Sequence, residues 1–534
     1  MSMRRVLLRE KTKARLTGPG LVLLAAVCVL ILSLCRSPGG DINYYNSDAT
    51  WHVLMTLQAY EETPVSVHKF LPIISMGEEM DKGITWGATI PDEAGNYYYT
   101  SFSAAEFVLP YFFIRLFHLP VAESSLYLFN CLLFFTYAAL LGLLTAEVFR
   151  DRRHGPWLGA LAVVVSTCAP ELLHGMGVVY WAQSVMQVTL LIQLYAYYRY
   201  AARGSRGAYV LFLSLCLVNP YIEWTGFVAN GGYMLCELVR CRKTPLRALG
   251  KFALPGVLTA ASFALFSLHF MSVVTPADYW AALASRFLVR SALSSASFLT
   301  LFKGYVSSFL FLWPLLAALL LAVTACWRGL GWARESLLAR QGWLLFAAAF
   351  PALENIVMKQ HAITYTYDRM KLIFPLTLIL CDLCGLIWAR AEKKVWLAAI
   401  PVVLALAAAG ANVCAYVGNS DYIWPAEYRE DNRVLAERVS AYEEDSVMGC
   451  TAYAGRAIYL DFHRGVYEYV DLDAVASMAR ESGKRYALLL SFGDNALTSW
   501  GMPAYDKVEV YDAETGTLTE LRAEDGRILE TVVD

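Results

Sequence analysis

A cluster of acidic and imidazole side chains follows the first long apolar segment of the chain. Asp48 lies there, with Asp41 before it and His52 one helical turn after it. Asp48 has the chemistry of a general base. With Ser47 it could equally be a helix N-cap, because a helix-compatible run starts here. We weigh these two roles of Asp48 evenly. We take Asp41 and His52 as candidate substrate contacts, with an ordinary loop acid as the alternative for Asp41.

A second cluster, far along the chain, combines cations with aromatic residues. It contains Lys359 and His361, then the run 365–369 (Tyr-Thr-Tyr-Asp-Arg), then Lys371. Guanidinium, ammonium and imidazolium groups bind phosphate, so Arg369, helped by Lys359 and His361, is a candidate phosphate contact. The alternative is structural, with Asp368 pairing with Arg369 or Lys371 and the tyrosines lying at a membrane interface.

Glu223 and Trp224 are the third candidate pair. They follow a short apolar run that ends in Asn219-Pro220-Tyr221, as in a broken helix that lines a cavity. A carboxylate and an aromatic face at such a position could hold a sugar. By contrast, Cys381 and Cys384 form a CxxC inside an apolar helix, where packing explains them better than redox or metal chemistry.

The elements that position these residues are membrane helices. The chain is 57% hydrophobic and 17% charged, which is far from a soluble composition. At roughly twenty residues per crossing, its apolar runs predict about eleven spans, or nine if two short runs are re-entrant. The runs are 21–35, 126–149, 157–169, 178–198, 208–218, 224–238, 252–274, 305–326, 342–358, 370–389 and 395–417.

Basic residues set the orientation of these spans. Arg4, Arg5 and Arg9 precede the first run, and arginines or lysines recur in every second loop, whereas loops 170–180 and 218–225 contain none. The positive-inside rule therefore places the N-terminus in the cytoplasm and the C-terminus outside. We expect the first run to be retained as a span, because no small-residue cleavage site follows it.

Two polar regions share the outer side. Residues 36–125 form a large loop with a helix at 50–61 and an amphipathic surface helix at 102–119, inside a membrane domain of residues 1–418. Residues 419–534 predict a small acidic α/β domain, because 23 of the 46 acids but 11 of the 44 bases follow Gly418. Its expected elements are helices 427–441 and 473–483, strands 446–451 and 486–491, and a hairpin around Asp525-Gly526.

This layout resembles the GT-C superfamily of membrane glycosyltransferases, especially the branch of protein O-mannosyltransferases and aminoarabinose transferases. Asp48 matches the early acid of their first outer loop. The segment 98–111 resembles the surface helix that closes that loop. Arg369, followed by 373–376, resembles the basic residue before a late span. The chain departs from the family where the usual Asp-Glu pair is Ser47-Asp48, and it has no Lys-Pro-Pro element and no Trp-Trp-Asp motif.

The resemblance implies transfer of a sugar from a polyprenyl-phosphate donor to an extracytoplasmic glycan, lipid or protein. Asp48 would be the catalytic base, Arg369, His361 and Lys359 would bind the donor phosphate, and Glu223, Trp224, Asp41 and His52 would contact sugar or acceptor. No cofactor is then required, no metal ligand is assigned, and a divalent metal stays compatible with the sequence. The expected location is a bacterial plasma membrane, with the site on the outer face.

Two other functions fit the same sequence. Broken helices and intramembrane acids also build secondary transporters, although no internal repeat is visible. A polysaccharide ligase or polymerase that uses lipid-diphosphate glycans shares the expected layout. Nucleic-acid binding is excluded as a main function, because no basic stripe is present outside short interhelical loops.

Overall fold

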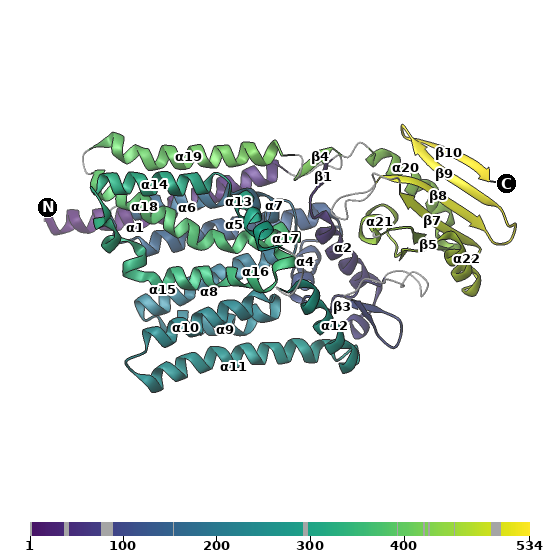
Figure 1. Ribbon diagram of the computed structural model, residues 1–534, viewed down its shortest axis with the longest axis horizontal. Helices are drawn as coiled ribbons and strands as arrows, with labels where there is room; N and C mark the ends of the chain where they lie inside the picture. The colour runs from purple at the N-terminus through teal and green to yellow at the C-terminus, as the bar shows by residue number, and fades with distance from the viewer. Residues whose placement is uncertain are drawn as a thin grey trace.

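A bundle of long helices and a separate α/β unit make up the computed structural model of the chain (Figure 1). The segment predicted as the first outer loop lies between these two parts, where α2 (Ser47–Glu62) and β3 (Tyr97–Tyr99) are drawn, and we name this end of the bundle the outer end. The structure describes residues 3–36, 42–75, 89–152, 154–291, 297–391, 394–419, 422–425, 428–452, 454–492 and 504–533. The prediction of a helical membrane domain followed by a small C-terminal sheet domain is confirmed.

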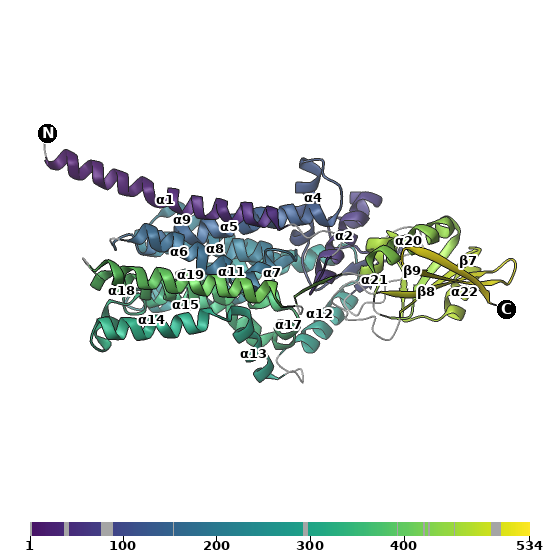
Figure 2. The same cartoon turned by 90° about the horizontal axis from the view of Figure 1, so that it is seen from above.

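Each predicted apolar run contains at least one helix of the bundle. The helices lie side by side along the long axis of the molecule, and α1 extends beyond the others at its N-terminal end (Figures 1 and 2). They are α1 (Met3–Cys35), α5 (Glu123–Val148), α6 (Gly155–Thr167), α8 (Ala182–Arg203), α9 (Arg206–Ile222), α10 (Thr225–Arg240), α11 (Pro245–Phe270), α14 (Leu312–Cys326), α15 (Leu337–Ala349), α18 (Ile373–Ala391) and α19 (Val395–Val417).

By length and hydropathy, four helical segments among the described residues can cross a membrane, or five if a bent pair is one span. Three further apolar helices are shorter, namely Pro19–Cys35, Gly155–Thr167 and Arg206–Ile222. Buried polar side chains explain part of the difference from eleven, because Gln183, Gln187 and Gln193 lower the hydropathy of α8 while facing the protein interior. The count of eleven spans stays a prediction.

The sequence predicted a single span at 305–326, and in the structure the helix over this run is broken. α13 (Phe298–Phe309) and α14 meet at an angle of 75°. Leu310 at the break has a φ of 27°, and Pro314 lacks the N–H that would bond to the carbonyl of Leu310. The run 342–358 is broken in a similar way at Pro351, after α15 ends at Ala349.

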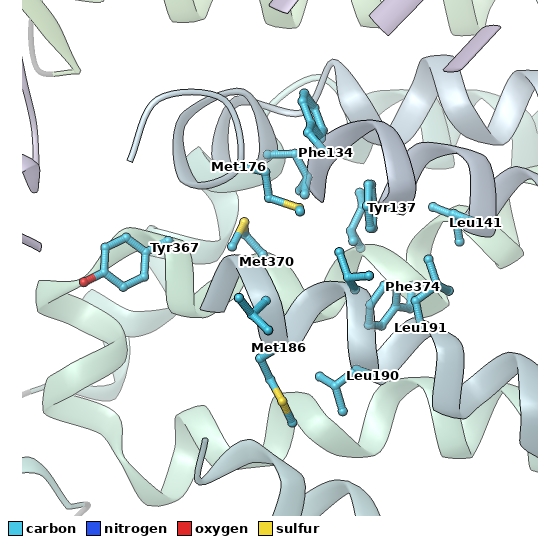
Figure 3. Close-up of a cluster of buried hydrophobic side chains, with 14 of the residues drawn as sticks. Phe134, Tyr137, Leu141, Met176, Met186, Leu190, Leu191, Tyr367, Met370 and Phe374 are labelled. Carbon is cyan, nitrogen blue, oxygen red and sulfur yellow. The ribbon is translucent and has the colours of Figure 1, made fainter. Parts of the chain in front are cut away.

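The centre of the bundle is packed with large apolar side chains. The ring of Tyr137 in α5 packs beside that of Phe134 in the same helix, and its centre lies 6.3 Å from that of Phe374 in α18. Leu190 of α8 belongs to the same cluster, and Tyr367 and Met370 lie at its outer end (Figure 3). Such a core fixes the positions of helices that enter from different parts of the chain. The outer ends of α8 and α18 therefore form a rigid floor for the polar groups above them.

The first outer loop folds against that floor. It contains α2 (Ser47–Glu62), α3 (Val65–His68), a hairpin of β2 (Thr89–Pro91) with β3 (Tyr97–Tyr99), and α4 (Ala105–Leu116). Later segments complete the outer end: α7 (Pro170–Gly175), α12 (Pro276–Arg290), α16 (Glu354–Val357), α17 (Lys359–Thr364) and the 3-10 segments η3 (Phe350–Leu353) and η4 (Thr366–Leu372). α12 lies between two predicted spans and had not been expected as an element.

The C-terminal unit is a six-stranded mixed sheet in the order β10-β9-β8-β7-β5-β6. Alternate residues of β5 face opposite layers: Val447 packs with α22, and Met448 packs with α20 and α21. The predicted helices, strands and hairpin all have counterparts. The elements are α20 (Arg429–Val439), β5 (Ser446–Cys450), α21 (Gly455–Phe462), β6 (Tyr467–Glu468), α22 (Leu472–Glu481), β7 (Tyr486–Phe492), β8 (Tyr505–Asp512), β9 (Leu518–Glu524) and β10 (Arg527–Val533).

Two contacts join this unit to the first outer loop. β1 (Ile42–Tyr44) pairs antiparallel with β4 (Ile423–Pro425), immediately after the last bundle helix. α21 packs on α2, as both views show (Figures 1 and 2). The C-terminal unit thus lies directly over the helix that carries Asp48.

Candidate active site

Helix α2 presents Asp48 and His52 on one face, because residues four apart in a helix lie one above the other. Both side chains are buried. The helix begins at Ser47, and its N-cap residue is Asn46, whose φ of 59° turns the chain into the helix without a side-chain cap bond. Asp48 is therefore inside the first turn, and the N-cap role that the sequence left open does not apply to it.

The carboxylate of Asp48 pairs with an arginine from the C-terminal unit. Arg456 Nη1 lies 3.1 Å from Asp48 Oδ2, and the two side chains are only 10% and 4% exposed. Arg456 is the second residue of α21. One acid of the first outer loop and one cation of the C-terminal unit thus share a buried site.

Two further arginines reach the same region from α12. Arg290 Nη2 donates to the Tyr99 hydroxyl at 3.3 Å, and Arg286 Nε donates to Ser101 Oγ at 3.1 Å. They are four residues apart, so they share one face of α12. The Thr275 hydroxyl caps this helix by accepting a bond from the Asp278 amide.

Aromatic rings connect the arginines to His52. The ring of His52 lies 4.4 Å from that of Tyr99 and 5.2 Å from that of Trp181. On the other side, the guanidinium of Arg290 lies 6.0 Å from the centre of the Tyr365 ring. Aromatic faces next to charged groups are the surfaces on which proteins hold sugar rings and apolar chains.

The electrostatics of the site favour anions. Burial, followed by the charges of Arg456, Arg286 and Arg290, lowers the pKa of His52 well below its usual value, so this ring is neutral at neutral pH. Burial raises the pKa of Tyr99, but the two α12 arginines outweigh it and lower the pKa overall. Burial raises the pKa of Asp48 to about 6, with Arg456 acting in the opposite direction. Asp48 is thus ionised near neutral pH and can accept a proton.

The second predicted cluster forms a buried network rather than an exposed surface. His361 Nδ1 is hydrogen-bonded to Asp368 Oδ2, and Gln183 donates to the other oxygen of Asp368 at 2.7 Å. Lys371 pairs with Glu354 and donates to the Thr225 hydroxyl at 2.9 Å. A phosphate that approached His361 would meet a ring already engaged by a carboxylate.

Arg369 lies on another side of this network. Its guanidinium donates to Ser308 Oγ at 2.7 Å and to the Ala362 carbonyl at 2.8 Å, and its Nη2 lies 3.5 Å from Glu171 Oε2. The side chains of Arg369, Glu171 and Ser308 are all buried. The group ties together α7, α13, α17 and η4, which is the geometry of a structural anchor. Its proposed contact with phosphate remains a prediction.

Replacing Arg369 by Ala is expected to destabilise the protein. The change leaves the buried carboxylate of Glu171 without its cation, and removal of one partner of a buried ion pair costs about 3–5 kcal/mol. The measurement is the thermal midpoint of the detergent-solubilised protein. The double variant Arg369→Ala with Glu171→Ala should recover part of the loss, and an unchanged midpoint in the single variant would contradict the anchoring role.

The remaining predicted residues lie at the edge of these groups. Glu223 accepts a hydrogen bond from the Thr225 amide at 3.0 Å at the start of α10. Its carboxylate also interacts electrostatically with the ammonium of Lys371. Trp224 Nε1 donates to the Ser101 carbonyl at 2.9 Å, next to Arg286. Lys359 stacks on the ring of Phe298 at 4.4 Å. Asp41 lies outside the described residues.

The sequence did not predict that Arg286, Arg290 and Arg456 are the cations around Asp48 and His52. Arg286 and Arg290 had one available signal, an arginine pair at a spacing of four on a predicted outer segment. Arg456 had none, since nothing in the local sequence separates it from other arginines of the acidic unit. Within the described ranges, no three His, Cys, Asp or Glu side chains are grouped so that they could hold a metal ion.

Comparisons of the whole chain with known proteins identify its fold. No protein-family model matches the chain, and no curated protein sequence matches it. Among solved structures it resembles the oligosaccharyltransferase AglB of Archaeoglobus fulgidus bound to an inhibitory peptide and a dolichol-phosphate. The identity is 13%, the TM-score is 0.56, and 98% of this chain and 76% of that chain are covered. It also resembles apo ArnT of Cupriavidus metallidurans, at 11% identity and a TM-score of 0.53, with 96% and 97% covered.

The chain therefore has the fold of the GT-C polytopic membrane glycosyltransferases, as the sequence resemblance had predicted. The coverage includes both the helical bundle and the C-terminal unit. At these identities the likeness concerns the fold, and the function has to be argued from the site.

Proposed function

We propose that this protein is a membrane glycosyltransferase that moves a sugar from a polyprenyl-phosphate donor to a hydroxyl of an extracytoplasmic acceptor. The observation that carries the proposal is a buried carboxylate, Asp48, next to a group of arginines: Arg456 pairs with it, and Arg290 lies beside the neighbouring rings of Tyr99 and His52, within a GT-C fold. A base for the acceptor and cations for the leaving phosphate are the two groups that such a reaction needs.

The chemistry proceeds in one displacement. Asp48 removes the proton of the acceptor hydroxyl as its oxygen forms a bond to the anomeric carbon of the sugar. The bond between that carbon and the phosphate oxygen breaks, and polyprenyl phosphate leaves with the bonding electrons. Arg290 and Arg286 stabilise the charge that develops on the phosphate, because preorganised cations in a water-poor site need no reorganisation.

The fold and the cations support this donor class. The AglB structure contains a dolichol-phosphate, which is a polyprenyl phosphate. In this chain, α12 places its two arginines at the outer end of the bundle, where the phosphate of a lipid in the outer leaflet would arrive. Arg369, His361 and Lys359 remain candidates for a supporting role in phosphate binding. Glu223, Trp224 and His52 are candidates for contacts to sugar or acceptor.

The experiment that tests the proposal is a profile of lipid-linked sugars and surface glycans in cells with and without the gene. We expect a polyprenyl-phosphate sugar to accumulate without the gene and a surface glycan, lipid or protein to lose a residue. If neither pool changes, the transferase proposal fails, and solute uptake by proteoliposomes becomes the next assay, because a secondary transporter is the main alternative.

The rate of transfer is expected to fall as the pH is lowered through about 6. Burial raises the pKa of Asp48 to about 6, and the base works only when it is deprotonated, so activity is present above this pH and lost below it. The measurement is the initial rate from pH 5 to pH 9 with membranes of cells that lack the gene as the source of donor and acceptor. A rate that stays constant down to pH 5 would contradict the role of Asp48.

A further inference from the structure

The C-terminal unit contributes a side chain to the candidate active site. Its helix α21 packs on α2, and the strand pair β1–β4 fixes the segment that leads from the bundle to the unit. At the start of α21, Arg456 is directed at the Asp48 carboxylate. A unit that merely covered the site would need no charged group at this depth.

A hydrogen bond at the start of α21 fixes the backbone next to Arg456. The amide of Gly455, just before it, donates to Glu468 Oε1 at 2.6 Å, which ties the N-terminal end of α21 to β6. A Cβ atom at position 455 would lie 3.0 Å from the same oxygen, so glycine allows this close approach. Arg456 thus extends from an end that the sheet holds in place.

We propose that Arg456 is a positioning residue of the active site, supplied by the C-terminal unit, which holds the Asp48 carboxylate ionised and oriented toward the acceptor. This inference rests on the proposed function. A guanidinium at this distance favours the charged form of a carboxylate that burial would otherwise neutralise. The C-terminal unit is then part of the catalytic machinery, and its docking decides whether the base is competent.

The other groups that face Asp48 do not replace Arg456. Tyr45 precedes α2, and Tyr365 and Tyr367 come from the η4 region. Burial, together with the charge of Asp48, raises the pKa of these three hydroxyls. Tyrosines are neutral near pH 7 and supply no cation. His52, on the next turn of α2, is kept neutral by burial and the arginines. Among the described groups that shift the pKa of Asp48, Arg456 is the charged one.

The test compares Arg456→Gln with Arg456→Lys in the full-length protein by two measurements. The first is the rate of transfer against pH with membranes of cells that lack the gene. The second needs no substrate: dicyclohexylcarbodiimide reacts with protonated buried carboxyls, so mass spectrometry of the peptide that contains Asp48 gives its protonation against pH. Arg438→Gln, which breaks a pair with Glu530 elsewhere in the unit, is the matched control.

In Arg456→Gln we expect both midpoints to rise by about one pH unit or more, since an opposite charge this close lowers a carboxylate pKa by about 1–3 units. Arg456→Lys should shift them less, and Arg438→Gln not at all. An even loss of rate at every pH with unchanged midpoints would overturn the positioning role and leave a structural one. A shifted labelling midpoint with no transfer by the wild type would overturn the proposed function while the ion pair stands.

Discussion

Replacing Asp48 by Asn is expected to lower the rate of sugar transfer about 10²- to 10⁴-fold, the usual contribution of a general base. Asn has nearly the same shape, so the change removes the proton acceptor and the ion pair with Arg456 while it preserves the volume that packs beneath α2. The loss should appear in turnover, since no donor contact is removed. The measurement is transfer by the purified variant at pH 8, where the wild-type carboxylate is ionised.

Glu61→Gln is the matched control for Asp48→Asn. Glu61 is an acid of the same helix, but its side chain is partly exposed and pairs with Arg115 on the surface. Its neutralisation should leave transfer unchanged. If Asp48→Asn retains full activity at normal expression and thermal stability, Asp48 is not the base, and the ring of His361 with its partner Asp368 becomes the next candidate.

Arg290→Ala is the second change for which we expect a large effect. The loss should be about 10²- to 10³-fold in turnover, as for the removal of one preorganised donor to a developing negative charge. Binding of the donor should weaken as well, because Arg290 meets the phosphate in the ground state too. Donor binding and turnover are measured separately, by titration of a short-chain polyprenyl-phosphate sugar and by single-turnover transfer.

Three related variants separate charge from packing at this position. Arg290→Lys keeps the charge but loses the planar fork, so it should recover part of the activity. Adding Arg286→Ala to Arg290→Ala should weaken donor binding further. Arg115→Ala removes an exposed arginine of α4 and should change neither quantity. Unchanged donor binding in Arg290→Ala would contradict the role of Arg290, and Arg369 or Lys359 would then be the candidate that binds the phosphate.

The sequence was informative wherever the physics is local. Hydropathy located the bundle helices, since a lipid-facing helix must be apolar along most of its length. Alternation and turn residues predicted the C-terminal elements, down to the hairpin at Asp525-Gly526. The helical spacing of Asp48 and His52 predicted that they share a face, and the structure buries both on α2. The early acid and the late basic residue also carried the resemblance to the GT-C fold.

The sequence was less informative where helices break or carry polar groups. It predicted one span from 305 to 326, and the structure has two helices that meet at 75°. It left two roles open for the cluster 359–371, a phosphate site at the membrane surface or the pairing of Asp368 with Arg369 or Lys371. The structure buries these groups in other pairs: Asp368 with His361, Lys371 with Glu354, and Arg369 with Glu171. A hydropathy window records how many charges a segment has, but it does not record whether each charge meets a counter-ion.

The sequence by itself thus determined the helical bundle and the appended sheet unit, and it supplied the acid that we propose as the base. Only the tertiary structure decided which cations accompany that acid. Arg290 reaches the site through the course of α12, and Arg456 reaches it because the C-terminal unit folds back onto α2. Contacts between residues so far apart leave no periodic trace in one sequence, because they depend on how whole elements pack and not on the spacing within any of them.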